Sequence, residues 1–378
     1  MSSGVLEAST DWAASVGLLA TKDYGDSEVV FHGGEPLTAG VAFYRQALPR
    51  MRGRFRPRLH LSMQTNLWLL TDEMCELFAE YGVSLGTSLD GPEEITDAQR
   101  GEGYYRRTMT GVERASRWGL SVGCICTFTR YSAARAGEIF DFFIGEGLDF
   151  AIHAAVTPLR SPERGWSLLP EAYGEVLVAV LNRYLDRLGR VRISTLDALS
   201  HSVSAGESGL CTFRDCLGNY LAVAPDGGIY PCQRFAGQGA FRLGYVGEMP
   251  DAKALAASPA WRLLYEREER VQEECGDCPH FAYCKGGCPY DALAAGGGEF
   301  RTLRDPYCEA YQRIFSYITD RALEEVFSDE NLQEVARNPD EATFLRRGPL
   351  ISLMRGDVRP GDSRPARRRT FTAVTGDV

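Results

Sequence analysis

Eight of the eleven cysteines of the chain lie between Cys211 and Cys308, with a spacing that is typical of metal ligands. The first group reads Cys211-x4-Cys216-x15-Cys232. The second group reads Cys275-x2-Cys278-x5-Cys284-x3-Cys288-x19-Cys308. Eight thiolates supply two sites of four ligands with none left over. The second half of the chain is therefore predicted to be a metal-binding module.

The composition limits the cellular compartment and the binding partners that we expect for this chain. Hydrophobic residues make up 44% and charged residues 24% of the chain, as in ordinary globular proteins. The net charge of −10 argues against nucleic-acid binding, and no apolar run approaches the ~20 residues of a membrane span. The N-terminal segment lacks the basic and apolar regions of a secretory signal. We expect a cytoplasmic protein with no nucleic-acid or membrane partner, in which clustered cysteines bind metal and do not form disulfides.

Apolar strands and amphipathic helices alternate through about the first 155 residues. Strands are predicted at residues 29–31, 59–64, 83–89, 122–127 and 150–153. Helices are predicted at residues 5–19, 39–51, 72–81, 110–118, 134–146 and 170–188. Repeated strand–helix units favour parallel strands with helices outside, so the predicted fold class is α/β.

The second half is predicted to be a small α+β unit around the cysteines. Two short apolar strands flank a turn at Asp226-Gly227, which is a hairpin signal. Ser258 and Pro259 begin a helix, and an amphipathic helix follows at residues 306–327. After Arg355 the chain is rich in Gly, Pro, Ser, Asp and Arg, which predicts a disordered tail.

Polar segments follow three successive strands of the first half. Their candidate binding residues are Gly33, Gly34, Glu35, Gln64, Asn66, Ser88 and Asp90. The two glycines would let a ligand approach the backbone, and the Glu35 carboxylate could receive a cation such as an α-amino group. A β/α barrel carries its chemistry at the carboxyl ends of its strands. Alternatively, Asn66 and Asp90 only cap helices and turns, although three such segments in order, followed by the cysteine module, favour a binding site.

The cysteine pattern resembles that of the SPASM domain, the auxiliary-cluster extension of radical S-adenosylmethionine (SAM) enzymes. Gly227-x4-Cys232 fills the middle element of that pattern, and every later spacing fits. Gly33-Gly34-Glu35-Pro36 resembles the glycine-rich motif that receives the SAM amino group in the same enzymes, and the resemblance extends over roughly residues 25–325. It implies a partial (β/α)6 barrel over residues 1–205, a SPASM domain over 206–330, and an extension over 331–378 that is largely disordered after residue 355.

The resemblance also implies the metal ligands. One [4Fe–4S] cluster would be held by Cys211, Cys216, Cys232 and Cys288. A second would be held by Cys275, Cys278, Cys284 and Cys308. With every iron ligated, these clusters would serve electron transfer or structural support. The alternative is two zinc sites of four cysteines each, which thiolates also form.

The function implied by the resemblance is modification of a peptide or protein substrate. Radical SAM enzymes split SAM at a [4Fe–4S] cluster, and the resulting 5′-deoxyadenosyl radical abstracts a substrate hydrogen. The glycine motif, Glu35, Ser88 and Asp90 would help to bind SAM, and Gln64 and Asn66 would line the site. A reductant such as flavodoxin or ferredoxin would be a partner, and no catalytic acid or base can be named.

The chain departs from the family at the radical SAM cluster itself. It contains no Cys-x3-Cys-x2-Cys motif, and its remaining cysteines, Cys75, Cys124 and Cys126, are expected to be small buried hydrophobes. The first barrel strand is also missing, which would leave an unpaired parallel edge. We expect a start assigned at an internal methionine or a truncated gene, so that a full-length parent would carry the third cluster. The rival interpretation is a degenerate protein that kept only its auxiliary clusters.

A second departure concerns the substrate. Sulfatase-maturating relatives place an aspartate, a candidate base, directly after the third cysteine of the module, where this chain has Gln233. Formylglycine formation is therefore disfavoured. Two functions remain: a radical SAM/SPASM oxidoreductase that modifies peptides, inactive as written for lack of the cluster cysteines, and a non-catalytic two-cluster electron carrier or binding protein.

Overall fold

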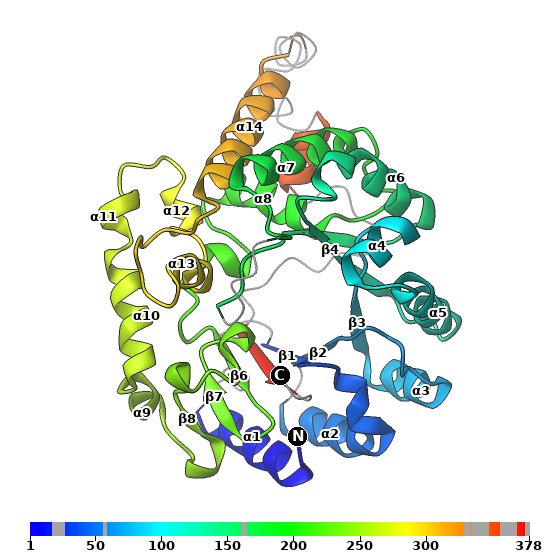
Figure 1. Cartoon of the computed structure of the whole chain (residues 1–378), viewed down its shortest axis with the longest axis vertical. Coiled ribbons are helices and arrows are strands. Elements are labelled where there is room, and N and C mark those ends of the chain that lie inside the picture. The colour runs from blue at the N-terminus through cyan, green and yellow to red at the C-terminus, as the bar shows by residue number, and fades with distance from the viewer. Residues whose placement is uncertain are drawn as a thin grey trace.

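The computed structural model describes residues 1–16, 27–55, 59–159, 165–328, 333 and 348–355, and the backbone of residues 369–374. Five parallel strands follow one another in chain order: β1 (Ser27–His32), β2 (Leu59–Gln64), β3 (Val83–Ser88), β4 (Val122–Phe128) and β5 (Phe150–Ala154). Helices connect them: α2 (Gly40–Arg54), α3 (Asp72–Tyr81), α4 (Glu93–Arg100), α5 (Tyr104–Arg117) and α6 (Ala136–Glu146). These helices lie on the outer side of the curved sheet (Figure 1). The predicted α/β class, with a partial parallel barrel, is confirmed.

The two faces of this sheet differ in chemistry. Buried and half-buried residues alternate along β1 and β2, and the buried set is apolar except for Ser27, as in Val29, Phe31 and Leu61. Phe31 meets Tyr44 of α2 edge-on, with ring centroids 5.3 Å apart. The half-buried set on the opposite face is mostly polar and includes Glu28, His32, Ser62 and Gln64. Parallel strands covered on both faces are usually apolar throughout, so the inner face of this sheet is not packed as a core.

The edge of β1 is paired, contrary to the sequence prediction. Strand β9 (Arg369–Val374) pairs in parallel with β1 on one side and with β6 (Tyr220–Val223) on the other. The predicted unpaired edge is therefore wrong, and the predicted disorder after residue 355 does not hold for residues 369–374. Unpaired backbone N–H and C=O groups at an edge accept an extended segment, and Thr-Phe-Thr-Ala-Val has the composition of a strand. The remaining tail residues lie outside the described part of the chain.

The predicted hairpin is present and continues the same sheet. β6 and β7 (Gly228–Tyr230) are antiparallel, and β8 (Gly244–Tyr245) follows, which gives the order β5-β4-β3-β2-β1-β9-β6-β7-β8. The Asp226 Oδ1 atom accepts a hydrogen bond from the Gly228 N–H at 2.9 Å, and Gly227 has a φ of 85°. A positive φ at this position explains the Asp-Gly sequence of the turn.

Helices make up most of the remaining chain. α7 (Pro170–Leu185) and α8 (Ser194–Ala205) precede the cysteines. The others are α9 (Ala252–Ala256), α10 (Pro259–Arg270), α11 (Gln272–Cys275), α12 (Phe281–Cys284), α13 (Pro289–Ala295), α14 (Cys308–Val326) and α16 (Pro349–Arg355). Helices α10 to α13 lie on the left side of Figure 1, opposite the barrel strands β3 and β4. None of the described helices is long and apolar enough to cross a membrane.

Apolar packing joins the two halves. Phe31 and Leu61 of the barrel belong to the same buried cluster as Leu221, Val223 and Ile229 of the hairpin. The N-terminal helix α1 (Ser3–Ser15) also reaches the second half, because the buried Trp12 donates its indole N–H to the Pro250 carbonyl at 2.8 Å. The cysteine module is therefore held against the barrel by a shared core, while the predicted domain boundaries stay a prediction.

Close packing of α5 gives a stability prediction. A Cβ atom on Gly111 would collide with the Leu67 side chain and lie 2.9 Å from the Leu67 carbonyl oxygen. Gly111→Ala should therefore destabilise the protein by about 1–3 kcal/mol in chemical denaturation. Gly53→Ala in α2 is the matched control, since nothing lies within 4 Å of its added Cβ, and it should stabilise by about 0.5–1 kcal/mol. Equal effects of the two substitutions would contradict this packing.

Candidate metal centres and cofactor site

Four cysteines from separate segments lie close enough together to influence one another's pKa values. We call them the first group: Cys211, Cys216, Cys232 and Cys288. Burial raises the pKa of the Cys216 thiol well above its usual value, and the nearby Cys211 and Cys232 raise it further. Burial is also the main cause of the raised pKa of Cys288, and Asp291 and Cys211 add to it. Thiolates held this close in a buried site repel one another, and a bound cation relieves that repulsion.

The other four cysteines form a second group: Cys275, Cys278, Cys284 and Cys308. Burial raises the pKa of Cys284 to about 12, with Cys308, Asp305 and Cys275 adding to the shift. All four line one pocket, together with Arg304 and Gln312. The two groups coincide with the two ligand sets implied by the sequence resemblance, whose binding of clusters stays a prediction.

The donor chemistry of both groups fits an iron–sulfur cluster. All eight thiols are free of disulfides. One zinc ion would draw four sulfurs to about 2.3 Å from a common point. Within the described ranges, no three His, Cys, Asp or Glu side chains converge in a way that could hold one metal ion. A [4Fe–4S] cube takes four cysteine thiolates, one on each iron, so each group supplies the number and kind of donors that one cube needs.

Two glycines shape the segment between Cys284 and Cys288. Gly286 and Gly287 both have positive φ, of 75° and 74°. A Cβ on Gly287 would collide with Asp305, whose Oδ2 atom accepts a hydrogen bond from the Cys288 N–H at 2.8 Å. Because these glycines form a tight turn, Cys284 lies in the second group and Cys288 in the first, although only three residues separate them.

The glycine-rich segment after β1 is tied to the end of β2. The Glu35 carboxylate accepts hydrogen bonds from the Thr65 hydroxyl at 2.6 Å, the Asn66 N–H at 2.8 Å and the Leu37 N–H at 3.0 Å. Glu35 thus begins the short helix η1 (Pro36–Ala39) and joins two strand ends. Gly33, with a φ of 135°, and Gly34 precede it. The structure therefore brings Glu35 and Asn66 together, with the carboxylate fixed by three donors.

Gln64 and Ser88 lie on the inner face of the sheet. Gln64 pairs in register with Gly86 of β3, and a Cβ on Gly86 would collide with the Gln64 amide. The absence of a side chain at Gly86 leaves space for the Gln64 amide. Ser88 is half-buried at the end of β3. Both residues are placed at the carboxyl ends of neighbouring strands, as the sequence predicted.

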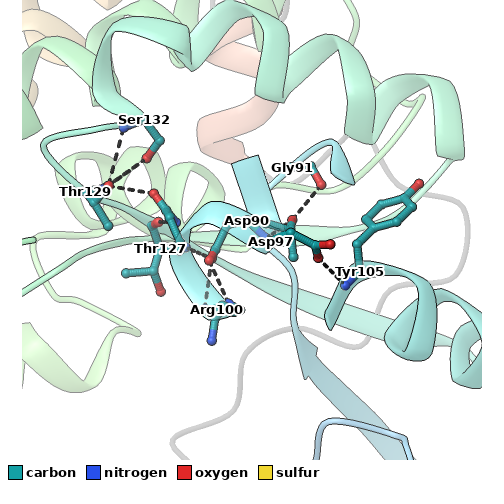
Figure 2. Close-up of polar contacts among 10 residues, drawn as sticks. Asp90, Gly91, Asp97, Arg100, Tyr105, Thr127, Thr129 and Ser132 are labelled. Atoms are coloured by element: carbon teal, nitrogen blue, oxygen red, sulfur yellow. Dashed lines mark hydrogen bonds and ion pairs between the residues drawn. The ribbon is translucent and has the colours of Figure 1, made fainter. Parts of the chain in front are cut away.

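Asp90 is engaged within the protein. Its carboxylate receives two hydrogen bonds from Arg100, at 2.6 and 2.9 Å, and one from the Thr127 N–H at 2.9 Å. Figure 2 shows this network between the end of β3, helix α4 and strand β4. With 1% of its area exposed, the side chain has no surface to offer a ligand. This geometry favours the alternative that Asp90 braces the loop, and the Asn66 Oδ1 atom likewise caps a turn by accepting from the Trp68 N–H at 2.9 Å.

Three polar residues near the first group were not predicted from the sequence. Arg234 forms a 2.6 Å ion pair with Asp291, and His153 ends the inner face of β5. His153 is exposed, yet desolvation lowers its pKa, with Arg234 adding to the shift and Asp291 opposing it. The strand alternation that places Gln64 inward could have identified His153, whereas no local pattern marks Arg234 or Asp291.

Comparisons with known proteins agree with the sequence resemblance. The radical SAM superfamily matches residues 12–142, and the SPASM iron–sulfur cluster-binding domain matches residues 211–279. An uncharacterized protein of Methanothermobacter thermautotrophicus is 48% identical over 177 residues, which cover 46% of this chain and 66% of that protein. A serine-type anaerobic sulfatase-maturating enzyme of Klebsiella aerogenes is 29% identical over 315 residues, covering 79% of this chain and 74% of that enzyme.

A solved structure has a similar fold. Native anSMEcpe with bound AdoMet matches with a TM-score of 0.73 at 23% identity, over 90% of this chain and 91% of that chain. The two chains therefore share a fold over nearly their whole length.

The Asp90 network predicts a large stability effect. Asp90→Asn removes the charge that balances a largely buried guanidinium, so it should cost about 2–4 kcal/mol in chemical denaturation. Arg106→Gln is the control, because its ion pair with Glu93 is exposed, and its loss should be much smaller. A negligible loss of stability in Asp90→Asn would contradict the bracing role and would favour a role of Asp90 in ligand binding.

Proposed function

Because the chain is a radical SAM protein with a SPASM domain, we propose that it holds two [4Fe–4S] clusters and serves the modification of a peptide or protein. The first group, Cys211, Cys216, Cys232 and Cys288, is the ligand set of one cluster. The second group, Cys275, Cys278, Cys284 and Cys308, is the ligand set of the other. The observation that carries this proposal is that eight free thiols fall into two sets of four: the members of one set raise one another's pKa values, and the members of the other line one pocket.

The SAM site of the proposal lies at the carboxyl ends of β1 to β3. Gly33 and Gly34 leave the backbone open to a ligand, Glu35 is held in place by Thr65 and Asn66, and Gln64 and Ser88 line the wall. Asp90 supports this site from behind through Arg100 and Thr127. SAM supplies, when it is cleaved at a radical SAM cluster, the 5′-deoxyadenosyl radical that abstracts hydrogen from a substrate.

The 378-residue chain has no ligand set for that third cluster. It contains no Cys-x3-Cys-x2-Cys, and the three cysteines outside the two groups are buried. Burial raises the pKa of Cys124 to about 12, which opposes the thiolate form that a metal ligand needs. We therefore expect this polypeptide to bind two clusters and not to cleave SAM by itself. The competing function is a two-cluster electron carrier or binding protein, and the contacts that fix the Glu35 carboxylate favour the enzyme.

The substrate is proposed to be a peptide or protein other than a sulfatase. Serine-type and cysteine-type sulfatase-maturating enzymes are among the relatives of the chain, which supports a polypeptide substrate. Gln233, directly after Cys232, cannot act as a base, so formylglycine formation is disfavoured. His153 is a titratable group on the inner face that can contact a substrate there. We also propose that the protein is cytoplasmic and that a reductant such as flavodoxin or ferredoxin supplies its electrons.

Metal analysis tests the proposal directly. After anaerobic reconstitution, the protein should contain about eight irons and eight sulfides. Its electron paramagnetic resonance (EPR) spectrum should not change on addition of SAM, and no 5′-deoxyadenosine should form. Two zinc ions, or about twelve irons with a SAM-sensitive spectrum, would each contradict the proposal.

Paired substitutions test the partition of the thiols. Replacing Cys211 and Cys232 together by alanine should leave about four irons, since both belong to the first group. Replacing Cys232 and Cys278 together should abolish both clusters, because each group loses one ligand. Cys75→Ala is the control and should keep the full iron content. An equal iron content in the two double variants would overturn the partition.

A further inference from the structure

The guanidinium of Arg234 makes three contacts beside the first group. Its Nη1 atom donates a hydrogen bond to the Cys288 Sγ atom at 3.7 Å, and its Nη2 atom lies 2.6 Å from the Asp291 Oδ1 atom. The guanidinium carbon stands 4.0 Å from the centroid of the Tyr290 ring. A charged donor, an anionic anchor and an aromatic face thus fix the position of one positive charge against a ligand sulfur.

Both ends of this contact belong to segments that carry ligands of the first group. Arg234 lies in the short helix η4 (Gln233–Phe235), two residues after Cys232, and Asp291 lies in the first turn of α13, three residues after Cys288. Tyr290 is buried in the same turn. The backbone N–H groups of Arg234 and Phe235 also face the Cys232 sulfur, where they oppose the rise in pKa that burial causes. The ion pair therefore clamps two ligand segments together.

The second group lacks an equivalent contact among the described residues. There, the neutral amide of Gln312 donates to the Cys278 Sγ atom at 3.8 Å. Arg304 lines the pocket and lowers the pKa of Cys308, against a larger effect of burial. Within the part of the chain that the structure describes, only the first group therefore has a guanidinium hydrogen-bonded to a ligand sulfur. The field of Arg234 also reaches the inner face of the barrel, because it contributes to the lowered pKa of His153 on β5.

We propose that Arg234 is a positioning residue that raises the reduction potential of the cluster held by the first group and makes it the easier of the two to reduce. This inference rests on the proposed function, which supplies the clusters. Reduction adds a negative charge, and a fixed positive charge in contact with a ligand sulfur stabilises that added charge. Hydrogen bonds to the sulfurs are a recognised control of cluster potential. The first group would thereby accept electrons beside the polar inner face of the barrel.

A redox titration of the reconstituted protein, followed by EPR, tests this role. Arg234→Met should lower the potential of the first-group couple, with a roughly tenfold change in its reduction equilibrium, or about 59 mV for one electron. The second-group couple should stay at its wild-type potential. The variant with Cys211 and Cys232 replaced by alanine keeps only the second group and so assigns each couple.

Two further variants separate this role from general damage. Arg234→Lys keeps the charge without the forked geometry, so its first-group potential should fall between those of the wild type and Arg234→Met. This variant carries the test if the methionine variant loses iron, and a wild-type potential for it would then overturn the inference. Arg304→Met should move only the second couple.

Unchanged potentials in Arg234→Met, or equal shifts of both couples, would also overturn the inference. A wild-type protein that binds zinc, or fewer than about eight irons, would instead contradict the proposed function itself.

Discussion

The structure depends on bringing thiols from distant segments to two small regions, where their thiolate forms would repel one another. Burial and neighbouring sulfurs both raise the pKa values of Cys211, Cys216 and Cys284, so without a bound cation the groups favour neutral thiols. The surrounding fold supplies what keeps them close. The β6–β7 hairpin positions Cys232, the glycines before Cys288 reverse the chain, and Asp305 holds the Cys288 backbone.

The parallel sheet supplies the second part of the site through the contrast between its two faces. The outer face buries apolar side chains against α2 to α6, and this packing fixes where the strand ends lie. The inner face keeps Glu28, Ser62, Gln64 and His153 partly or fully accessible. Because the same apolar cluster continues into the hairpin, the polar face and the first group of cysteines are positioned by one core.

Much of the fold could be predicted from local sequence signals. The strands at residues 59–64 and 83–88 and the helix capped by Thr71 follow from alternation, capping and turn residues, all of which act over a few positions. Helices α4 and α8 were missed for different reasons. Helix α4 directly follows Gly91-Pro92, and α8 is rich in serine, a residue of modest helix propensity. Tertiary packing of Ile95 in α4, and of Leu196 and Leu199 in α8, favours these helices where local propensity does not.

The sequence by itself determined the number and spacing of the thiols, the parallel α/β order, and the polar residues at the strand ends. Each of these features follows from a sequence pattern that can be identified without knowing the three-dimensional structure. Tertiary structure alone decided that Arg100 engages Asp90, that residues 369–374 pair with β1, and that Arg234 bridges Asp291 and Cys288. These contacts join segments with no fixed spacing between them, and their energies depend on burial and direction, which exist only once the chain has folded.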